Sequence, residues 1–168
     1  MMVDAIRLMV FPALMAFAAS SDFLTMTISN KVSLALVAGF LILAVLTGMS
    51  TSELGWHLGA GALVLAVAFV FFALGWIGGG DAKLAAATAL WLGFDQLLTY
   101  LIYASLLGGA LTLVLINVRL MPLPGFLQGR GWAERLHAKD GGIPYGIALA
   151  IAALLVYPDS VWMKAAGA

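Results

Sequence analysis

Two aspartates stand out among the residues that could do chemistry, because each adjoins an apolar segment and has no basic residue immediately beside it. Asp22 follows the Ala-Ala-Ser-Ser end of one apolar segment, and Asp81 follows Gly78-Gly79-Gly80 at the start of another. Two carboxyl groups that meet in a partly dry site cannot both ionise cheaply, so they share a proton. One can then act as a base toward water while the other acts as an acid toward a peptide carbonyl. The pair is therefore a candidate aspartyl protease dyad.

Other catalytic chemistries lack their residues in this sequence. Cysteine is absent, which excludes disulfides, thiolate zinc sites and cysteine nucleophiles. The two histidines, His57 and His137, are too few for a histidine-based metal cluster. We therefore expect no metal and no cofactor. The formal net charge is zero, which predicts no general attraction to nucleic acid.

Each part of this candidate site also fits a simpler role. Asp81 could cap the unpaired backbone N–H groups at the start of a helix, and Asp22 could be a charge at the membrane interface. The glycines at 78–80 would let a substrate backbone come close to Asp81 in a small hydrated notch, but a tight turn between two helices would use them equally well. Lys83 could act on Asp81 or hold a substrate carboxylate, or it could reach toward the lipid headgroups.

The composition indicates that the elements which position these aspartates lie in a membrane. The 168 residues are 64% hydrophobic and only 10% charged, whereas a soluble domain carries about 25% charged residues. Too few polar groups are present to cover a water-exposed exterior, so lipid must be the solvent for most of the surface. The chain is therefore expected to be an all-α, polytopic membrane protein.

Six segments are candidates for spanning helices, because about 20 apolar residues cross a hydrocarbon core of about 30 Å. They are residues 5–21, 32–47, 56–77, 82–94, 97–118 and 143–157. The fourth is short, since it covers roughly 20 Å, and it could either cross or re-enter on the same side. We expect residues 1–168 to form a single transmembrane domain, a bundle of six helices with Gly-x-Gly-Asp at the start of the fourth.

Lysine and arginine discriminate between these two topologies, because cytoplasmic loops are enriched in them. Six crossings leave Arg7 and Lys164 on one side of the membrane and all the others on the opposite side. These others are Lys31, Lys83, Arg119, Arg130, Arg135 and Lys139. A fourth segment that does not cross would divide the same residues less cleanly. Six crossings therefore predict both termini outside the cytoplasm, and they put Asp22 and Asp81, in the connections after the first and third helices, at the cytoplasmic face.

The connection at about 119–142 is long and amphipathic. It alternates Phe126, Leu127, Trp132 and Leu136 with Arg130, Arg135 and Lys139. This pattern suits a segment that lies on an anionic lipid surface, and guiding a substrate is the alternative. Arg119, which ends the fifth helix, is expected to be interfacial. Trp91, Trp162 and Tyr157 are expected in the aromatic belts at the membrane boundaries.

Three motifs together resemble the prepilin peptidases, the type IV leader peptidase family of Gly-x-Gly-Asp aspartyl proteases. Gly78-Gly79-Gly80-Asp81-Ala82-Lys83-Leu84 matches the family's Gly-x-Gly-Asp motif and the lysine and leucine usual after it. Asp22-Phe-Leu-Thr-Met-Thr-Ile28-Ser-Asn30 resembles its first aspartate motif, an Asp followed by Ile-Pro-Asn, with Ser29 in place of the proline. Gly142-Ile-Pro144-Tyr145-Gly-Ile-Ala-Leu-Ala is similar to its last-helix signature. The resemblance spans nearly the whole chain and is closest to the short CpaA/TadV-type enzymes that process Flp (tight-adherence) pilins.

This resemblance implies an aspartic endopeptidase that removes the leader of prepilins or pseudopilins at the cytoplasmic face of the bacterial inner membrane. Such substrates have a single transmembrane helix. The residues equivalent to the catalytic pair are Asp22 and Asp81, and the loop at 78–83 would lie beside them. Ile28, Asn30, Pro144 and Tyr145 belong to the supporting motifs. Longer members of the family also methylate the new N-terminus and carry CxxC zinc ligands, so methyltransferase activity is not expected of a chain without cysteine.

Two other functional classes remain open from the sequence. A small ion- or proton-coupled transporter would also keep carboxylates in the membrane, although nearer to the bilayer midplane. A non-catalytic membrane subunit of a pilus assembly machine would use the aspartates only as helix caps. The sequence does not define the substrate, the oligomeric state or the separation of the two carboxyl groups.

Overall fold

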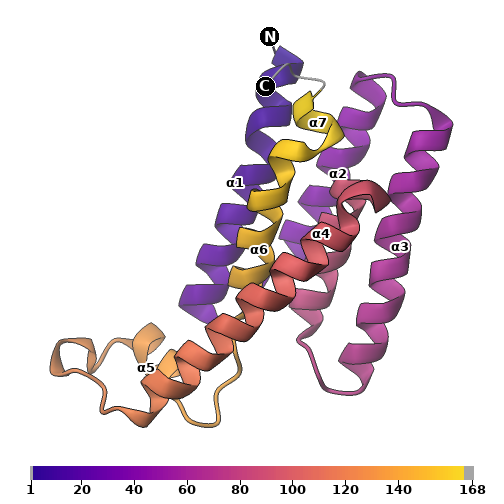
Figure 1. The fold of residues 1–168 in the computed structure, drawn as a ribbon. Helices are drawn as coiled ribbons and strands as arrows, with labels where there is room; N and C mark the ends of the chain where they lie inside the picture. Colours follow the sequence, from indigo (N-terminus) through magenta and orange to yellow (C-terminus); the bar gives the residue numbers. More distant parts are fainter. Residues whose placement is uncertain (1, 165–168) are drawn as a thin grey trace.

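The computed structural model describes residues 2–164, and within that range the chain forms helices and no strand. The long helices are α1 (Met2–Thr25), α2 (Asn30–Leu46), α3 (Thr51–Ala73), α4 (Gly79–Leu120) and α6 (Tyr145–Val156), packed side by side in Figure 1. The shorter elements are η1 (Gly125–Leu127), α5 (Gly131–His137), η2 (Tyr157–Asp159) and α7 (Val161–Lys164). The prediction of an all-α bundle is confirmed.

The bundle has helices that suit a bilayer. Four described helical segments, Val3–Thr25, Thr51–Ala73, Gly79–Leu120 and Tyr145–Lys164, are long and apolar enough to cross a membrane, and α2 is apolar but shorter. The outward faces are apolar as well, with large side chains such as Val45, Leu98 and Leu113 exposed. A surface of this kind is stable in hydrocarbon and not in water. The chain is a membrane protein.

The helix α4 consists of two helices joined by a sharp turn. Gly93 leaves the helical conformation with φ 65° and ψ −178°, and glycine reaches positive φ at little steric cost. The two halves run in opposite directions (Figure 1), and Ala85 of the first half lines the same cavity as Leu101 and Ala104 of the second. The segments predicted at 82–94 and 97–118 are therefore separate helices that meet at Gly93.

Buried aromatic side chains hold this turn against the rest of the bundle. Trp91 and Trp162 are almost fully buried; the Trp91 Nε1 donates to the Leu36 carbonyl, and the Trp162 Nε1 donates to the Trp91 carbonyl. Tyr157 is also buried, and its hydroxyl donates to the Arg7 carbonyl. The prediction that Trp91, Trp162 and Tyr157 lie in aromatic belts is wrong, because their polar atoms find carbonyl partners inside the bundle.

The two aspartates lie at one end of the bundle and inside helices, not in the connections between them. The helix α1 continues to Thr25, so Asp22 is in its last turn, and it ends where Met26 adopts φ 57°. Asp81 is in the first turn of α4. The α1–α2 and α3–α4 connections and the segment with α5 gather at this end in Figure 1, whereas α7 and the start of α1 lie at the other.

Candidate active site

Asp22 presents a buried carboxyl group at the end of α1, with only 4% of the residue exposed. Its Oδ2 accepts a hydrogen bond of 2.8 Å from the backbone N–H of Gly146. Gly146 belongs to the first turn of α6, where backbone N–H groups have no partner within the helix. The start of α6 therefore supplies an otherwise unused donor that holds the carboxyl group of α1.

Asp81 is half-buried and follows the N-cap residue Gly78 by three positions. Its carboxyl group interacts with the backbone N–H of Gly78, a contact typical of an acidic residue in the first turn of a helix. It is also close enough to the carboxyl group of Asp22 for the two charges to interact. Helix capping and closeness to Asp22 are therefore both properties of Asp81.

The N–H of Gly146 joins α6 to the site of the two carboxyl groups. It donates to Asp22, and Asp81 is close enough to Asp22 for their charges to interact, so three helices, α1, α4 and α6, contribute to one small polar site. Two neighbouring carboxyl groups can supply both the base and the acid that amide hydrolysis needs. Within residues 2–164, no three His, Asp or Glu side chains are close enough together to hold a metal ion.

Glycine permits close packing at three positions of this site. A Cβ at Gly146 would lie 2.7 Å from the Asp22 Oδ2, and one at Gly78 would lie 2.8 Å from the Asp81 Oδ2. A Cβ at Gly80 would lie 3.2 Å from the Ile28 Cβ. The third glycine of the predicted loop, at position 79, faces the ring of a phenylalanine in α3. These glycines let the backbone approach Ile28 and the two carboxyl groups.

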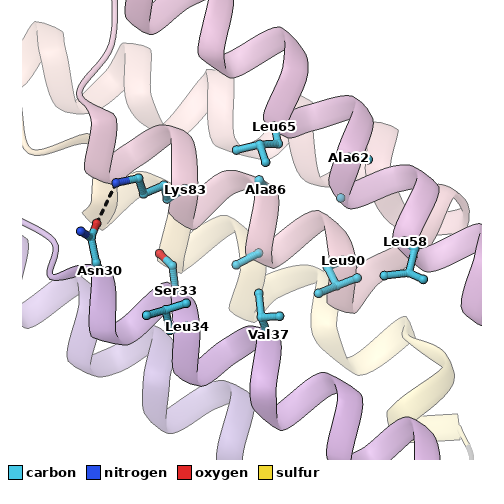
Figure 2. A pocket seen from close by; sticks show the side chains of 12 residues that line it. Asn30, Ser33, Leu34, Val37, Leu58, Ala62, Leu65, Lys83, Ala86 and Leu90 are labelled. Carbon is cyan, nitrogen blue, oxygen red and sulfur yellow. Dashed lines mark hydrogen bonds between the residues drawn. The ribbon is translucent and has the colours of Figure 1, made fainter.

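Lys83 joins the second aspartate motif to the first. Its Nζ donates a hydrogen bond of 2.8 Å to the Oδ1 of Asn30 (Figure 2). The pair stands at one end of an apolar pocket of about 560 Å³ between α2, α3 and α4, where Leu34 and Leu58 are among the lining residues. Lys83 therefore connects the start of α4 to the start of α2, while Asp81 faces α1 and α6.

Ser29 reproduces the backbone that a proline would have at this position. It is the N-cap of α2 with φ −65° and ψ 138°, and its side chain accepts from the N–H of Lys31. Proline is restricted to φ near −65°, so the substitution of serine for the family's proline keeps the chain direction. Ile28 consequently packs between Gly80 and Gly146, against the backbone of both later motifs.

Pro144 and Tyr145 hold the start of α6. Pro144 is fully buried and is the N-cap residue of α6. The Tyr145 hydroxyl lies 3.1 Å from the Oγ1 of Thr112 in α4, and its ring covers Gly108. Both residues thus support the segment that carries Gly146, whose N–H donates to Asp22.

The sequence analysis missed Gly146 as a site residue, and it did not anticipate the burial of Arg119. Gly146 stands in the last-helix signature, which could have identified it, but a backbone donor leaves no chemical signal in a sequence. Arg119 was expected to be interfacial, yet only 8% of it is exposed, and it hydrogen-bonds three backbone carbonyls. No local pattern in the sequence indicates those long-range bonds.

A family model matches more than half of the chain. The model of the type IV leader peptidase family matches residues 9–113. That range contains both aspartates and ends before Arg119 and Gly146. No match was found among curated proteins or among solved structures.

Proposed function

Since this chain belongs to the type IV leader peptidase family, we propose that it cleaves the leader of prepilin or pseudopilin substrates with Asp22 and Asp81 as its catalytic pair. The observation that supports this assignment is the approach of the two carboxyl groups: Asp22 is held by the N–H of Gly146, and its charge interacts with that of Asp81. Two carboxyl groups from helices far apart in the sequence have no structural need to come together. Helix capping explains the contact between Asp81 and Gly78, but it does not explain the approach of Asp22.

The proposed reaction is acid–base hydrolysis of the peptide bond at the leader junction. One carboxylate takes a proton from water, whose oxygen attacks the carbonyl carbon, while the other carboxyl group protonates the carbonyl oxygen. The resulting diol collapses as the carbon–nitrogen bond breaks. The first carboxyl group then gives its proton to the leaving nitrogen, and the diol returns a proton to the second. Both groups finish in their starting states, without a metal or a cofactor.

The site end of the bundle is proposed to face the cytoplasm of a bacterial inner membrane, with both termini in the periplasm. Basic side chains gather at that end: Lys83 beside Asn30, Arg119 at the end of α4, and Arg135, which donates to the Leu24 carbonyl at the end of α1. Cytoplasmic segments of membrane proteins are enriched in lysine and arginine. The segment with η1 and α5 would rest on the lipid surface through residues such as the exposed Phe126.

A groove next to the site is proposed to hold the membrane helix of the substrate. This cavity of about 590 Å³ lies between α3, α4 and α6, and its lining residues are uncharged. Ala85, one turn after Asp81 on the same helix face, and Tyr145, which precedes Gly146, are among them. The α4 wall includes a run of small residues after Leu101, namely Ala104, Ser105, Gly108 and Gly109, which allow a second helix to approach closely.

The substrate subclass is proposed to be the Flp (tight-adherence) pilins, from the motif resemblance of this short, cysteine-free chain. Methylation of the new N-terminus is not expected. A transporter would need carboxyl groups near the middle of the bundle and accessible in turn from either end. Asp22 and Asp81 lie at one end, which favours the peptidase.

Co-expression with a Flp-type prepilin tests this function. Asp22→Asn and Asp81→Asn should each abolish leader cleavage, because either change removes one of the two proton-transfer groups. Asp140→Asn, an aspartate of the exposed connection, is the matched control and should cleave like the wild type. The amount of each of the three variants in the membrane must also be measured and must equal that of the wild type. Wild-type cleavage by either dyad variant would refute the assignment.

A further inference from the structure

Arg119 is a buried cation whose three hydrogen bonds within the described residues go to backbone carbonyls. It lies at the end of α4. Its Nε donates to the Leu136 carbonyl at 2.8 Å, its Nη1 to the Gly141 carbonyl at 2.9 Å and its Nη2 to the Gly142 carbonyl at 2.7 Å. An arginine side chain is rigid and planar at its head and stays protonated, so it holds several acceptors in one fixed arrangement.

The three carbonyls belong to the segment that delivers Gly146 to Asp22. Gly142 is followed by Ile143 and the buried Pro144, and α6 begins at the next residue. Only three residues therefore lie between the last carbonyl held by Arg119 and the N–H that bonds the Asp22 Oδ2. Because proline restricts the backbone between them, a shift at Gly142 is transmitted to Gly146.

A second contact fixes the same segment from the same helix. The Tyr145 hydroxyl and the Thr112 Oγ1 are 3.1 Å apart, and Thr112 lies two turns before Arg119 on α4. The second half of α4 thus holds the start of α6 at two places, on either side of Pro144. In the described part of the chain, the hydrogen bonds of Arg119 and Thr112 go to groups other than the carboxyl groups of Asp22 and Asp81.

We propose that Arg119 is a positioning residue of the peptidase, which holds the Gly142–Gly146 segment so that the Gly146 N–H stays on the carboxyl group of Asp22. It acts through backbone carbonyls and touches no reacting atom. The kinetic part of this inference rests on the proposed function, whereas the structural part, from Arg119 to the Gly146 N–H, can be measured in a protein that cleaves nothing.

The kinetic test compares Arg119→Gln, Arg119→Lys and Arg130→Gln on a prepilin substrate. Arg130 is an exposed arginine of the same connection, at the N-cap of α5, and serves as the control. Arg119→Gln should lower kcat about tenfold or more with KM within about twofold, because misplaced catalytic groups slow the chemical step without weakening binding. Arg119→Lys should recover part of the loss, since an ammonium group can still bond some of the carbonyls. Equal kcat in Arg119→Gln and Arg130→Gln would overturn the proposal.

The structural test uses a feature of the sequence. Tyr145–Gly146 is the only Tyr-Gly pair in the chain, so carbonyl-¹³C tyrosine combined with ¹⁵N glycine gives one amide NMR signal, that of Gly146, in detergent or nanodiscs. Asp22→Asn defines the position of this signal when the carboxylate acceptor is lost. Arg119→Gln should move the signal toward that position, and Arg130→Gln should leave it at the wild-type value.

The two measurements separate the possible failures. A wild-type Gly146 signal in Arg119→Gln overturns the positioning role whatever the cleavage data show. A shifted signal with normal cleavage by Asp22→Asn refutes the proposed function and leaves the link from Arg119 to Gly146 intact. If Arg119→Gln does not reach the membrane, the NMR test uses Arg119→Lys instead. The Gly146 signal of Arg119→Lys must then lie away from the wild-type position for the proposal to stand.

Discussion

The backbone N–H of Gly146 and the Oδ2 of Asp22 are joined by a hydrogen bond of 2.8 Å between residues 124 positions apart. This bond brings the last-helix motif to the first aspartate motif, and Ile28 fills the space between Gly146 and Gly80. Three motifs that are separate in the sequence thus form one site.

Gly146→Ala should remove activity while the protein still inserts in the membrane. Its Cβ would lie 2.7 Å from the Asp22 Oδ2 and 2.5 Å from the Ile28 Cδ1, so the start of α6 must move away from both. We expect a loss of about a hundredfold in kcat. Gly55→Ala is the control, because a Cβ there has no neighbour within 4 Å. Full activity of Gly146→Ala in a prepilin cleavage assay would contradict the geometry of the site.

Lys83 is expected to act through Asn30 and not through Asp81. Lys83→Met and Asn30→Leu each remove the hydrogen bond of 2.8 Å between α4 and α2, which is exposed and should contribute about 1 kcal/mol to stability. Thermal unfolding of both single variants and the double variant should show that the effects are not additive. If Lys83→Met abolished cleavage while Asn30→Leu stayed fully active, the result would instead favour a direct role of Lys83 at the substrate.

Gly93→Ala should destabilise the fold more than a typical glycine substitution. It combines positive φ with a Cβ that would lie 3.0 Å from the His57 ring. Gly75→Ala is the matched control, because Gly75 also has positive φ but no neighbour within 4 Å. Gly93 also has ψ −178°, a backbone region that essentially only glycine adopts. The extra loss in Gly93→Ala, measured by denaturant or thermal unfolding, therefore reports that backbone strain together with the packing against His57. Equal stabilities would mean that the turn in α4 has room to adjust.

The parts of this structure that follow from local sequence were predictable. Segment length and apolarity predicted the helices, including the two halves of α4, because burial in lipid depends on short stretches of chain. Glycine and charge patterns predicted that Asp22 and Asp81 share one end. The bonds of Gly146 and Arg119 were not predictable, since a backbone donor and a backbone acceptor have no residue type. Trp91 lies inside the bundle although the sequence predicted it at the membrane boundary, because a tryptophan N–H can be satisfied either by water or by a buried carbonyl.

The groove between α3, α4 and α6 should decide whether an intact substrate binds. Gly109 lines it, and a Cβ at Gly109 has no neighbour within 4 Å, so Gly109→Leu would fill the groove without disturbing the fold. We expect this variant to lower kcat/KM about tenfold for a full prepilin, because two helices could no longer pack closely. Cleavage of a short peptide that contains the leader junction but lacks the membrane helix should be unchanged. Gly55→Leu, on α3 with open space around its Cβ, should leave both substrates unaffected. Equal loss on the two substrates in Gly109→Leu would indicate damage to the catalytic site and not a blocked groove.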